Sequence, residues 1–134
     1  TFPVDKKEIT KAILANKTNL KKIIKIIHAE IRKKMNIFLR NNRNKKIIIL
    51  DIPLLLENKI NKKNDVLIFV QANQKDKTKR LRQRANYNLQ ILKKFKKIQL
   101  SLDYKKKKSD FIIKNNFSRK SVKKRIEYIV KKII

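Results

Sequence analysis

The sequence predicts an α/β domain built on a parallel sheet. Short runs of β-branched apolar residues alternate with longer stretches of helical periodicity along the 134-residue chain. The runs are apolar without interruption, which is typical of strands that are buried on both faces of a parallel sheet. Only three strands are evident, so we expect a sheet that is incomplete. Hydrophobic residues make up 41% of the chain, enough for one modest core.

The first part of the chain predicts two helices. Residues 6–16 follow Asp5, a candidate N-cap, and Glu8 lies three residues later, as in a capping box. Residues 19–40 form the second, because apolar side chains recur there at spacings of three and four. These apolar positions are Leu20, Ile23, Ile24, Ile27, Ile31, Met35 and Phe38.

Three apolar runs predict strands, at residues 46–51, 65–70 and 111–113. We expect the first, which ends at Asp51, to lie centrally and parallel to the other two. Residues 76–84 and 88–99 predict two more helices. Ser121 is a candidate cap for a last helix. The apolar stripe of that helix is Val122, Ile126, Ile129, Val130 and Ile133.

The charge is extreme, with 39 Lys and Arg against 10 Asp and Glu and a net charge of +29. One interpretation is a polyanionic partner. The other is a codon bias toward Lys, Ile and Asn, which fits lysines scattered along every segment. Tyr87, Tyr104 and Tyr128 lie far apart and form no stacking motif for nucleic acid.

Several function classes are excluded by composition. The chain has no cysteine, so it forms no disulfide, thiolate metal site or cysteine nucleophile. No apolar run is long enough to cross a bilayer, and no signal peptide is visible. The absence of cysteine fits a reducing cytosol, and we expect no membrane partner.

The most specific string is Leu50-Asp51-Ile52-Pro53-Leu54-Leu55-Leu56-Glu57. An acid at the carboxyl end of a buried strand points into the crevice where α/β proteins bind ligands. Pro53 then forces the chain out of the sheet. The alternative, which stays open, is that Asp51 only caps the next turn.

This string resembles a motif of dephospho-coenzyme A kinases, in which Asp-x-Pro-Leu-Leu follows a strand and precedes Glu. Residues 4–9 resemble the segment where the family usually has Arg after an acid. Residues 27–32 resemble its His-Pro-x-x-Arg, with Ala29 in place of proline. Asp65 opens the next strand as the family's acid does.

The second half of the chain continues the resemblance. Residues 80–84 resemble the Arg-Leu-x-x-Arg that begins the family's lid. Gln99 and residues 105–115 resemble its carboxyl-terminal pattern, with Ser109 for the usual alanine and Lys114 for the second acid. Each match alone is weak, but their shared order is specific.

The resemblance implies a P-loop kinase-like, three-layer α/β fold that is incomplete at the amino end. It implies a single domain over residues 1–134. Within it, residues 5–45 are a helical substrate region, 46–75 the core strands, 76–108 the lid and following helices, and 109–134 the last strand and helix. The implied activity is ATP- and Mg²⁺-dependent phosphorylation of the ribose 3′-hydroxyl of dephospho-coenzyme A, the last step of coenzyme A synthesis.

The resemblance also assigns the substrate-binding residues. His28 and Arg32, four apart on one helix, are implied to hold dephospho-coenzyme A together with Asp51 and Glu57. Without the family, His28 reads as a packed or capping histidine and Arg32 as a solvated charge.

A second group of residues is implied to bind ATP. Arg80 and Arg84 are expected to close over the phosphates, which guanidinium groups bind through paired hydrogen bonds. Asn115 is expected near the adenine ring, while Asp110 is expected to cap or brace the third strand. The alternative for the two arginines is an ordinary basic helix.

The catalytic loop is the missing part. A Walker A loop needs glycine where its backbone approaches the phosphates, and this chain has 0 glycines. We therefore expect the loop and the catalytic acid upstream of Thr1, and no turnover from these residues alone. We expect no metal-ligating residue here, and the sequence leaves the oligomeric state open.

Two other functions remain as alternatives. The first is a basic, non-catalytic α/β module that binds nucleic acid, non-specifically and at low salt. The second is an α/β interaction domain that kept the fold and lost the chemistry.

Overall fold

The computed structural model describes residues 5–134 of the chain. Val4, where the resemblance begins, lies outside the described residues. The chain divides into two compact units, which are described separately. One holds the chain up to Pro53 with Gln90–Lys94, and the other holds Leu54–Leu89 with Phe95–Ile134.

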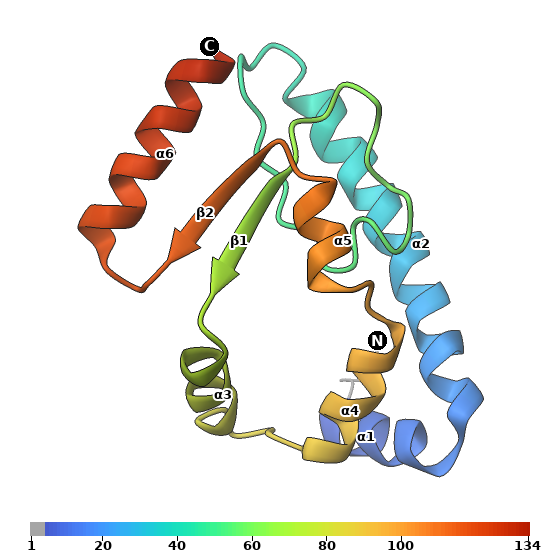
Figure 1. The fold of residues 1–134 in the computed structure, drawn as a ribbon. Coiled ribbons are helices and arrows are strands. Elements are labelled where there is room, and N and C mark those ends of the chain that lie inside the picture. Colours follow the sequence, from blue (N-terminus) through green and yellow to red (C-terminus); the bar gives the residue numbers. More distant parts are fainter. Residues whose placement is uncertain (1–4) are drawn as a thin grey trace. The chain divides into compact units, whose positions relative to one another are not determined.

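The first unit contains α1 (Lys6–Ala15) and α2 (Lys17–Asn41), which confirms both predicted helices (Figure 1). Asp5 is the N-cap of α1, as predicted, because its carboxylate accepts a hydrogen bond from the Lys7 N–H at 2.7 Å. Glu8 pairs with the ammonium group of Lys11 at 2.8 Å.

The two helices pack through their facing turns. Ile13 of α1 and Leu20 of α2 are buried, and the Asn19 amide donates to the Ala12 carbonyl at 2.9 Å. The ammonium group of Lys94 donates to the Ile13 carbonyl at 2.5 Å, so a cation satisfies the carboxyl end of α1. The apolar stripe of α2 is only partly covered, because Ile27 and Phe38 are exposed.

The predicted strand at residues 46–51 is wrong. These residues have no strand conformation in the described part of the chain, and the Ile49 side chain is 85% exposed. A strand needs a neighbour to satisfy its backbone N–H and C=O groups. None of the described strands pairs with this segment. The apolar run alone could not supply that partner.

The second unit is built on β1 (Ile68–Ala72) and β2 (Phe111–Asn115), which pair in parallel. Their pairing confirms two of the three predicted strands and the parallel orientation, although β1 begins later than residue 65. Asp110 braces the pair, as expected. Its N–H donates to the Leu67 carbonyl at 2.9 Å, and its carboxylate accepts from the Leu67 N–H at 2.7 Å.

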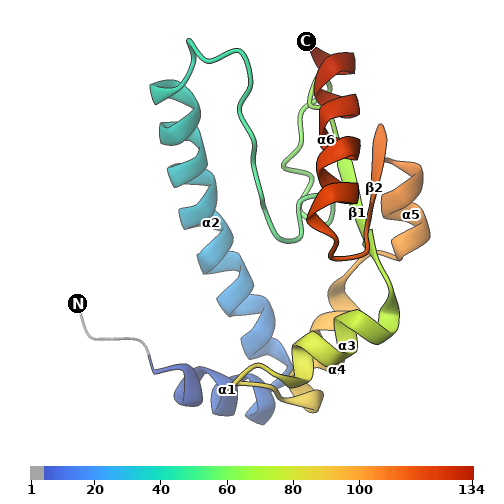
Figure 2. The same cartoon turned by 90° about the vertical axis from the view of Figure 1, so that its left-hand side faces the viewer.

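Helix α6 (Arg119–Ile133) covers β2 and forms the small core of this unit. Ile113 of β2 and Ile129 of α6 are both buried, and Arg125 donates from Nε to the Ile112 carbonyl at 3.1 Å. The two strands run between α6 and α5 (Leu102–Lys107) in Figures 1 and 2. This order of helix, sheet and helix agrees with the layered α/β fold that was predicted.

The remaining helices are α3 (Gln74–Arg82) and α4 (Leu89–Ile98), both close to their predicted positions. Helix α5 was not predicted, since its six residues are too few for a periodic apolar face. The predicted cap of the last helix is wrong. Ser118 is the N-cap residue of α6, and the Ser121 hydroxyl donates to Asn116 Oδ1 at 2.7 Å instead.

Candidate functional site

The carboxyl ends of β1 and β2 lie side by side, because Ala72 and Asn115 are partners in the strand register. Asn73 follows β1 and caps α3 by accepting from the Lys75 N–H at 2.9 Å. Parallel α/β sheets bind ligands at this edge, since loops and helix starts converge there. The second unit therefore has one edge where a site is expected.

Arg80, which follows β1, and Phe117, which follows β2, stack on each other at this edge. The guanidinium carbon of Arg80, in the last turn of α3, lies 3.9 Å from the centroid of the Phe117 ring. Such a distance is typical of a cation–π contact. Phe117 follows β2 closely, so the contact joins the two chain segments that leave the carboxyl edge.

The loop that carries Phe117 is held by the last residue of β2. The Asn115 side-chain oxygen accepts from the Phe117 N–H at 2.9 Å. The backbone of Phe117 has a φ of 61°, which is unusual for a bulky residue. Of the residues predicted to bind ATP, Arg80 and Asn115 are thus brought together, with Phe117 between them.

Arg84 lies in the turn that follows α3. Its N–H donates to the Leu81 carbonyl at 3.2 Å, and its carbonyl accepts from the Tyr87 N–H at 2.9 Å. The side chain is exposed. The turn therefore fixes the backbone of Arg84 and leaves its guanidinium group in solvent.

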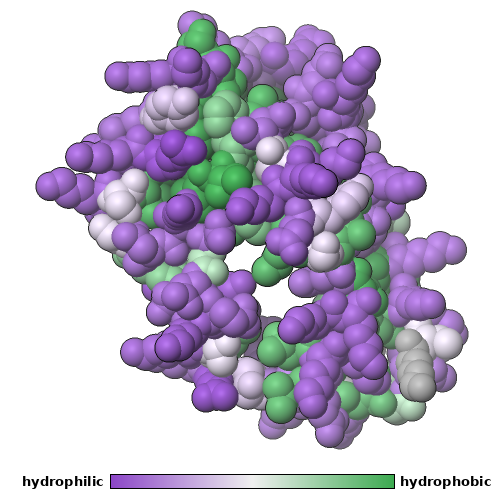
Figure 3. Space-filling model, in the orientation of Figure 1, coloured by the Kyte–Doolittle hydropathy of each residue, from purple (hydrophilic) through white to green (hydrophobic). Residues whose placement is uncertain are grey.

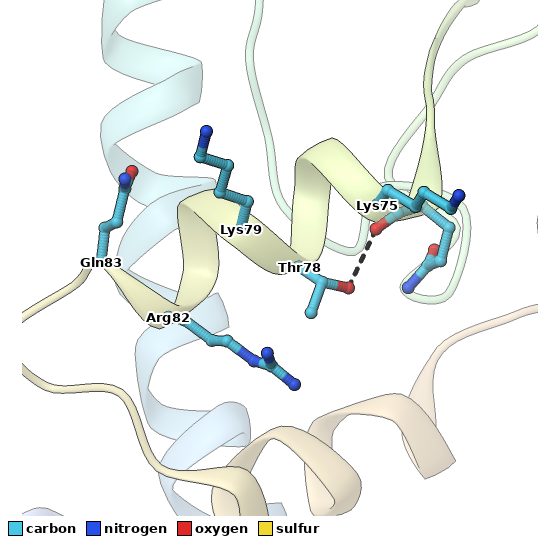
Figure 4. Close-up of a pocket in the computed structure, with 6 residues that line it drawn as sticks. Lys75, Thr78, Lys79, Arg82 and Gln83 are labelled. Carbon is cyan, nitrogen blue, oxygen red and sulfur yellow. Dashed lines mark hydrogen bonds between the residues drawn. The ribbon is translucent and has the colours of Figure 1, made fainter.

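A shallow hollow of about 560 Å³ lies along α3 (Figure 4). Lys79 and Gln83 project to one side of the helix and Arg82 to the other, so the cations do not converge on one point. The hollow is lined by Gln74, Lys75, Thr78, Lys79, Arg82 and Gln83. Its cations, Lys75, Lys79 and Arg82, add positive charge to the helix that carries Arg80.

Glu57 is engaged by two other groups of the second unit. One carboxylate oxygen lies 2.6 Å from the Lys105 ammonium nitrogen and accepts from the Leu100 N–H at 3.0 Å. The Glu57 and Lys105 side chains are only 10% and 20% exposed. Burial by itself would raise the pKa of Glu57, but these hydrogen bonds and the Lys105 charge outweigh it and lower the pKa below its usual value.

The other predicted substrate residues belong to the first unit. The His28 side chain is buried, while Arg32, one turn later on α2, is exposed. Asp51 is also exposed and follows the apolar residues 47–50. His28 and Arg32 therefore share a helix but lie in different surroundings.

No group of three or more His, Cys, Asp or Glu side chains in the described range could hold a metal ion. Within that range, no helix is both long and apolar enough to cross a membrane.

Comparison with known proteins decides the family. The model of the dephospho-CoA kinase family matches residues 3–121. The chain belongs to this family. The matched stretch contains every predicted site residue of the dephospho-CoA kinase pattern, from His28 to Asn115.

Individual dephospho-CoA kinases agree with the family match. The chain is 31% identical to the one from Wolbachia pipientis wMel over 129 residues, which is 95% of this chain and 66% of the relative. It is 31% identical over 126 residues to the one from Fusobacterium nucleatum subsp. nucleatum, which is 92% of this chain and 64% of the relative. The chain thus spans a little less than two thirds of the length of these dephospho-CoA kinases.

Phe117 and Lys105 had no predicted role. For Phe117, the signal in the sequence was its position close after Asn115. The pairing of Lys105 with Glu57 joins distant parts of the sequence and leaves no local pattern, so only the fold could reveal it.

Proposed function

We propose that this chain forms part of an enzyme that phosphorylates the ribose 3′-hydroxyl of dephospho-coenzyme A with ATP. The bond between the γ-phosphorus of ATP and its bridging oxygen breaks, and a bond from the 3′-oxygen to that phosphorus forms. The hydroxyl proton is released, and the products are coenzyme A and ADP. The observation that carries this proposal is the family match over residues 3–121.

For the substrate side, we assign His28, Arg32 and Asp51 to dephospho-coenzyme A. Arg32 is an exposed cation on α2 and suits a phosphate of the substrate. Asp51 is an exposed carboxylate that can accept hydrogen bonds from hydroxyl groups.

Glu57 takes part in a different way from the other substrate residues. Its carboxylate is already bonded to Lys105 and to the Leu100 N–H, which supports a role in anchoring these segments of the second unit. Direct contact with dephospho-coenzyme A would have to compete with a short ion pair at a mostly buried position.

For the ATP side, we assign Arg80, Arg84 and Asn115. All three follow the carboxyl ends of β1 and β2 or lie beside them, where α/β proteins bind nucleotides. Phosphoryl transfer depends mainly on positioning and on stabilising charge, so guanidinium groups near the phosphates suit it.

Mg²⁺ is a further proposal, made on family resemblance. Mg²⁺ is usually held by substrate phosphates with one or two carboxylates. Residues 5–134 present no cluster of metal ligands, so we assign none of these residues to the ion. A cytoplasmic location is proposed only because coenzyme A synthesis is expected there.

The residues assigned to dephospho-coenzyme A and those assigned to ATP can be distinguished by kinetics. The 134-residue chain would be extended before Thr1 with the strand and glycine-rich loop of a dephospho-CoA kinase. Arg32→Ala should then raise KM for dephospho-coenzyme A but not for ATP, and Asn115→Ala should do the reverse. Equal effects on both KM values would contradict the assignment.

A further inference from the structure

Residues 54–60, which we call the post-proline turn, follow Pro53 and are tied together by their own hydrogen bonds. The N–H and the side-chain amide of Asn58 both donate to the Leu54 carbonyl, at 3.1 Å and 2.6 Å. Two more backbone bonds of 3.2 Å close the turn, from Lys59 to Leu56 and from Ile60 to Leu55. This pair of bonds is the arrangement that ends many helices.

The post-proline turn contains two strained residues. Leu54 has a φ of 59° and Lys59 has a φ of 51°, in the left-handed region that is unfavourable for residues with a Cβ atom. Glycine usually takes the position of Lys59 in such a helix end. Strained residues of this kind persist only where the surroundings hold them, and they cluster at functional sites.

The group that holds the turn is the buried ion pair of Glu57. Its carboxylate lies 2.6 Å from the Lys105 ammonium nitrogen and accepts from the Leu100 N–H at 3.0 Å. The two charged side chains are only 10% and 20% exposed. Two apolar side chains at such a position often stabilise a fold as well as a buried ion pair does. The charged pair therefore contributes directional bonds that fix the turn against α5.

The turn lies close to Asp51 along the chain. Only Ile52 and Pro53 separate Asp51 from Leu54, so the Cα atoms of Asp51 and Leu54 are at most about 11 Å apart. The proline ring also fixes its own φ. A fixed turn therefore restricts where the exposed Asp51 carboxylate can lie.

From these observations we infer that Lys105 is a positioning residue for the phosphoryl acceptor. Through Glu57 it holds the post-proline turn in its strained conformation, and the turn places Asp51 for dephospho-coenzyme A. The identity of this substrate rests on the proposed function. None of the contacts of the turn described above involves Arg80 or Asn115, so the effect is selective for dephospho-coenzyme A over ATP.

Titration calorimetry of the 134-residue chain with dephospho-coenzyme A and, separately, with ATP measures this selectivity. Lys105→Met should weaken binding of dephospho-coenzyme A roughly 10-fold and leave ATP binding unchanged. Lys105→Arg keeps a cation for Glu57 and should retain most of the affinity. Lys106→Met is the matched control, because Lys106 is the next residue of α5 and is exposed, and it should change neither affinity.

The double variant Glu57→Gln/Lys105→Met separates positioning from stability. It removes both charges, so neither is left buried without its partner, and Gln keeps an acceptor for the Leu100 N–H. The thermal unfolding midpoint should return close to that of the wild type, while the affinity for dephospho-coenzyme A should stay low. A pair that only stabilises the fold would instead regain affinity together with the midpoint.

Asn58→Ala tests the same turn from its other tether, because it removes the side-chain bond to the Leu54 carbonyl. It should also weaken binding of dephospho-coenzyme A and not of ATP. Unchanged affinity for dephospho-coenzyme A in Lys105→Met, equal loss of both ligands, or no measurable affinity of the wild type for dephospho-coenzyme A would overturn the inference. The proposed function fails on a different result, the absence of phosphate transfer by the extended wild-type chain.

Discussion

At the scale of single residues, the two ion pairs Glu57–Lys105 and Glu127–Lys123 differ in what they can stabilise. The first has an N–O distance of 2.6 Å and is mostly buried, and it accepts a backbone N–H as well. The second has a distance of 3.8 Å with side chains 55% and 73% exposed. Exposed ion pairs contribute little to the free energy of unfolding, whereas removing one partner of a buried, charged hydrogen bond is costly.

Glu57→Gln should lower the free energy of unfolding by about 1–2 kcal/mol at pH 7, because it removes the charge but keeps an acceptor for the Leu100 N–H. The pKa of Glu57 is lower in the folded than in the unfolded state. The stabilisation is therefore fully present above the unfolded pKa of about 4.3 and is lost as the pH falls through the folded value.

Urea unfolding of wild type and Glu57→Gln at pH 7 and near pH 3 measures this difference. The difference should shrink in acid. Glu127→Gln is the control and should change the free energy of unfolding by less than about 0.5 kcal/mol at either pH. A difference for Glu57→Gln that does not depend on pH would mean that its charge has no part in the effect.

Arg84 is expected to act mainly in the transition state of the proposed reaction. Lysine keeps the charge but loses the planar, two-point hydrogen bonding of guanidinium. Arg84→Lys in the extended chain should therefore lower kcat about 10²- to 10³-fold with a smaller change in KM. Steady-state kinetics with Lys97→Ala as the control measures this. If the two variants behave alike, Arg84 is one more solvated cation.

At the scale of elements, sequence patterns predicted those whose partners lie within this chain. The apolar runs of β1 and β2 predicted two parallel strands, and the cap at Asp5 and the stripe of α2 predicted the first two helices. Residues 46–51 have an equally apolar run but no strand beside them in the described structure. Strand formation depends on a neighbour, which periodicity cannot report.

This contrast predicts different costs for two isoleucines of similar sequence context. Ile113 in β2 is 7% exposed, so Ile113→Ala should lower the free energy of unfolding by about 2–4 kcal/mol through lost contacts and a cavity. Ile49 is almost fully exposed, and Ile49→Ala should change it by less than about 0.5 kcal/mol. Thermal or urea unfolding compares them. A large loss from Ile49→Ala would show that residues 46–51 pack against a partner.

At the scale of the whole molecule, the site was only partly predictable. Family resemblance pointed to Arg80, Asn115 and Glu57. In the fold, each of these residues contacts another residue within the second unit. The resemblance could not reveal that Phe117 stacks on Arg80 or that Lys105 forms an ion pair with Glu57, because these contacts form only when distant segments of the chain meet. The net charge of +29 was evident from composition, and Figure 3 shows hydrophilic side chains over most of the visible face.

The charge predicts weak binding to DNA without sequence preference. Release of counterions drives such association, with dissociation constants of roughly 10⁻⁴ to 10⁻⁶ M at physiological salt. Fluorescence anisotropy with two unrelated duplexes should give equal affinities that fall steeply as salt rises. Tight binding that favours one duplex and resists salt would instead support the nucleic-acid-binding alternative.

Transfer of labelled γ-phosphate from ATP to dephospho-coenzyme A tests the proposed function most directly. The chain extended before Thr1 by a glycine-rich phosphate loop should convert dephospho-coenzyme A to coenzyme A, with the label on the ribose 3′-oxygen. The 134 residues alone should give no product, because they contain no glycine for that loop. Failure of the folded, ATP-binding extended chain to label dephospho-coenzyme A, or turnover by the 134 residues alone, would contradict the account.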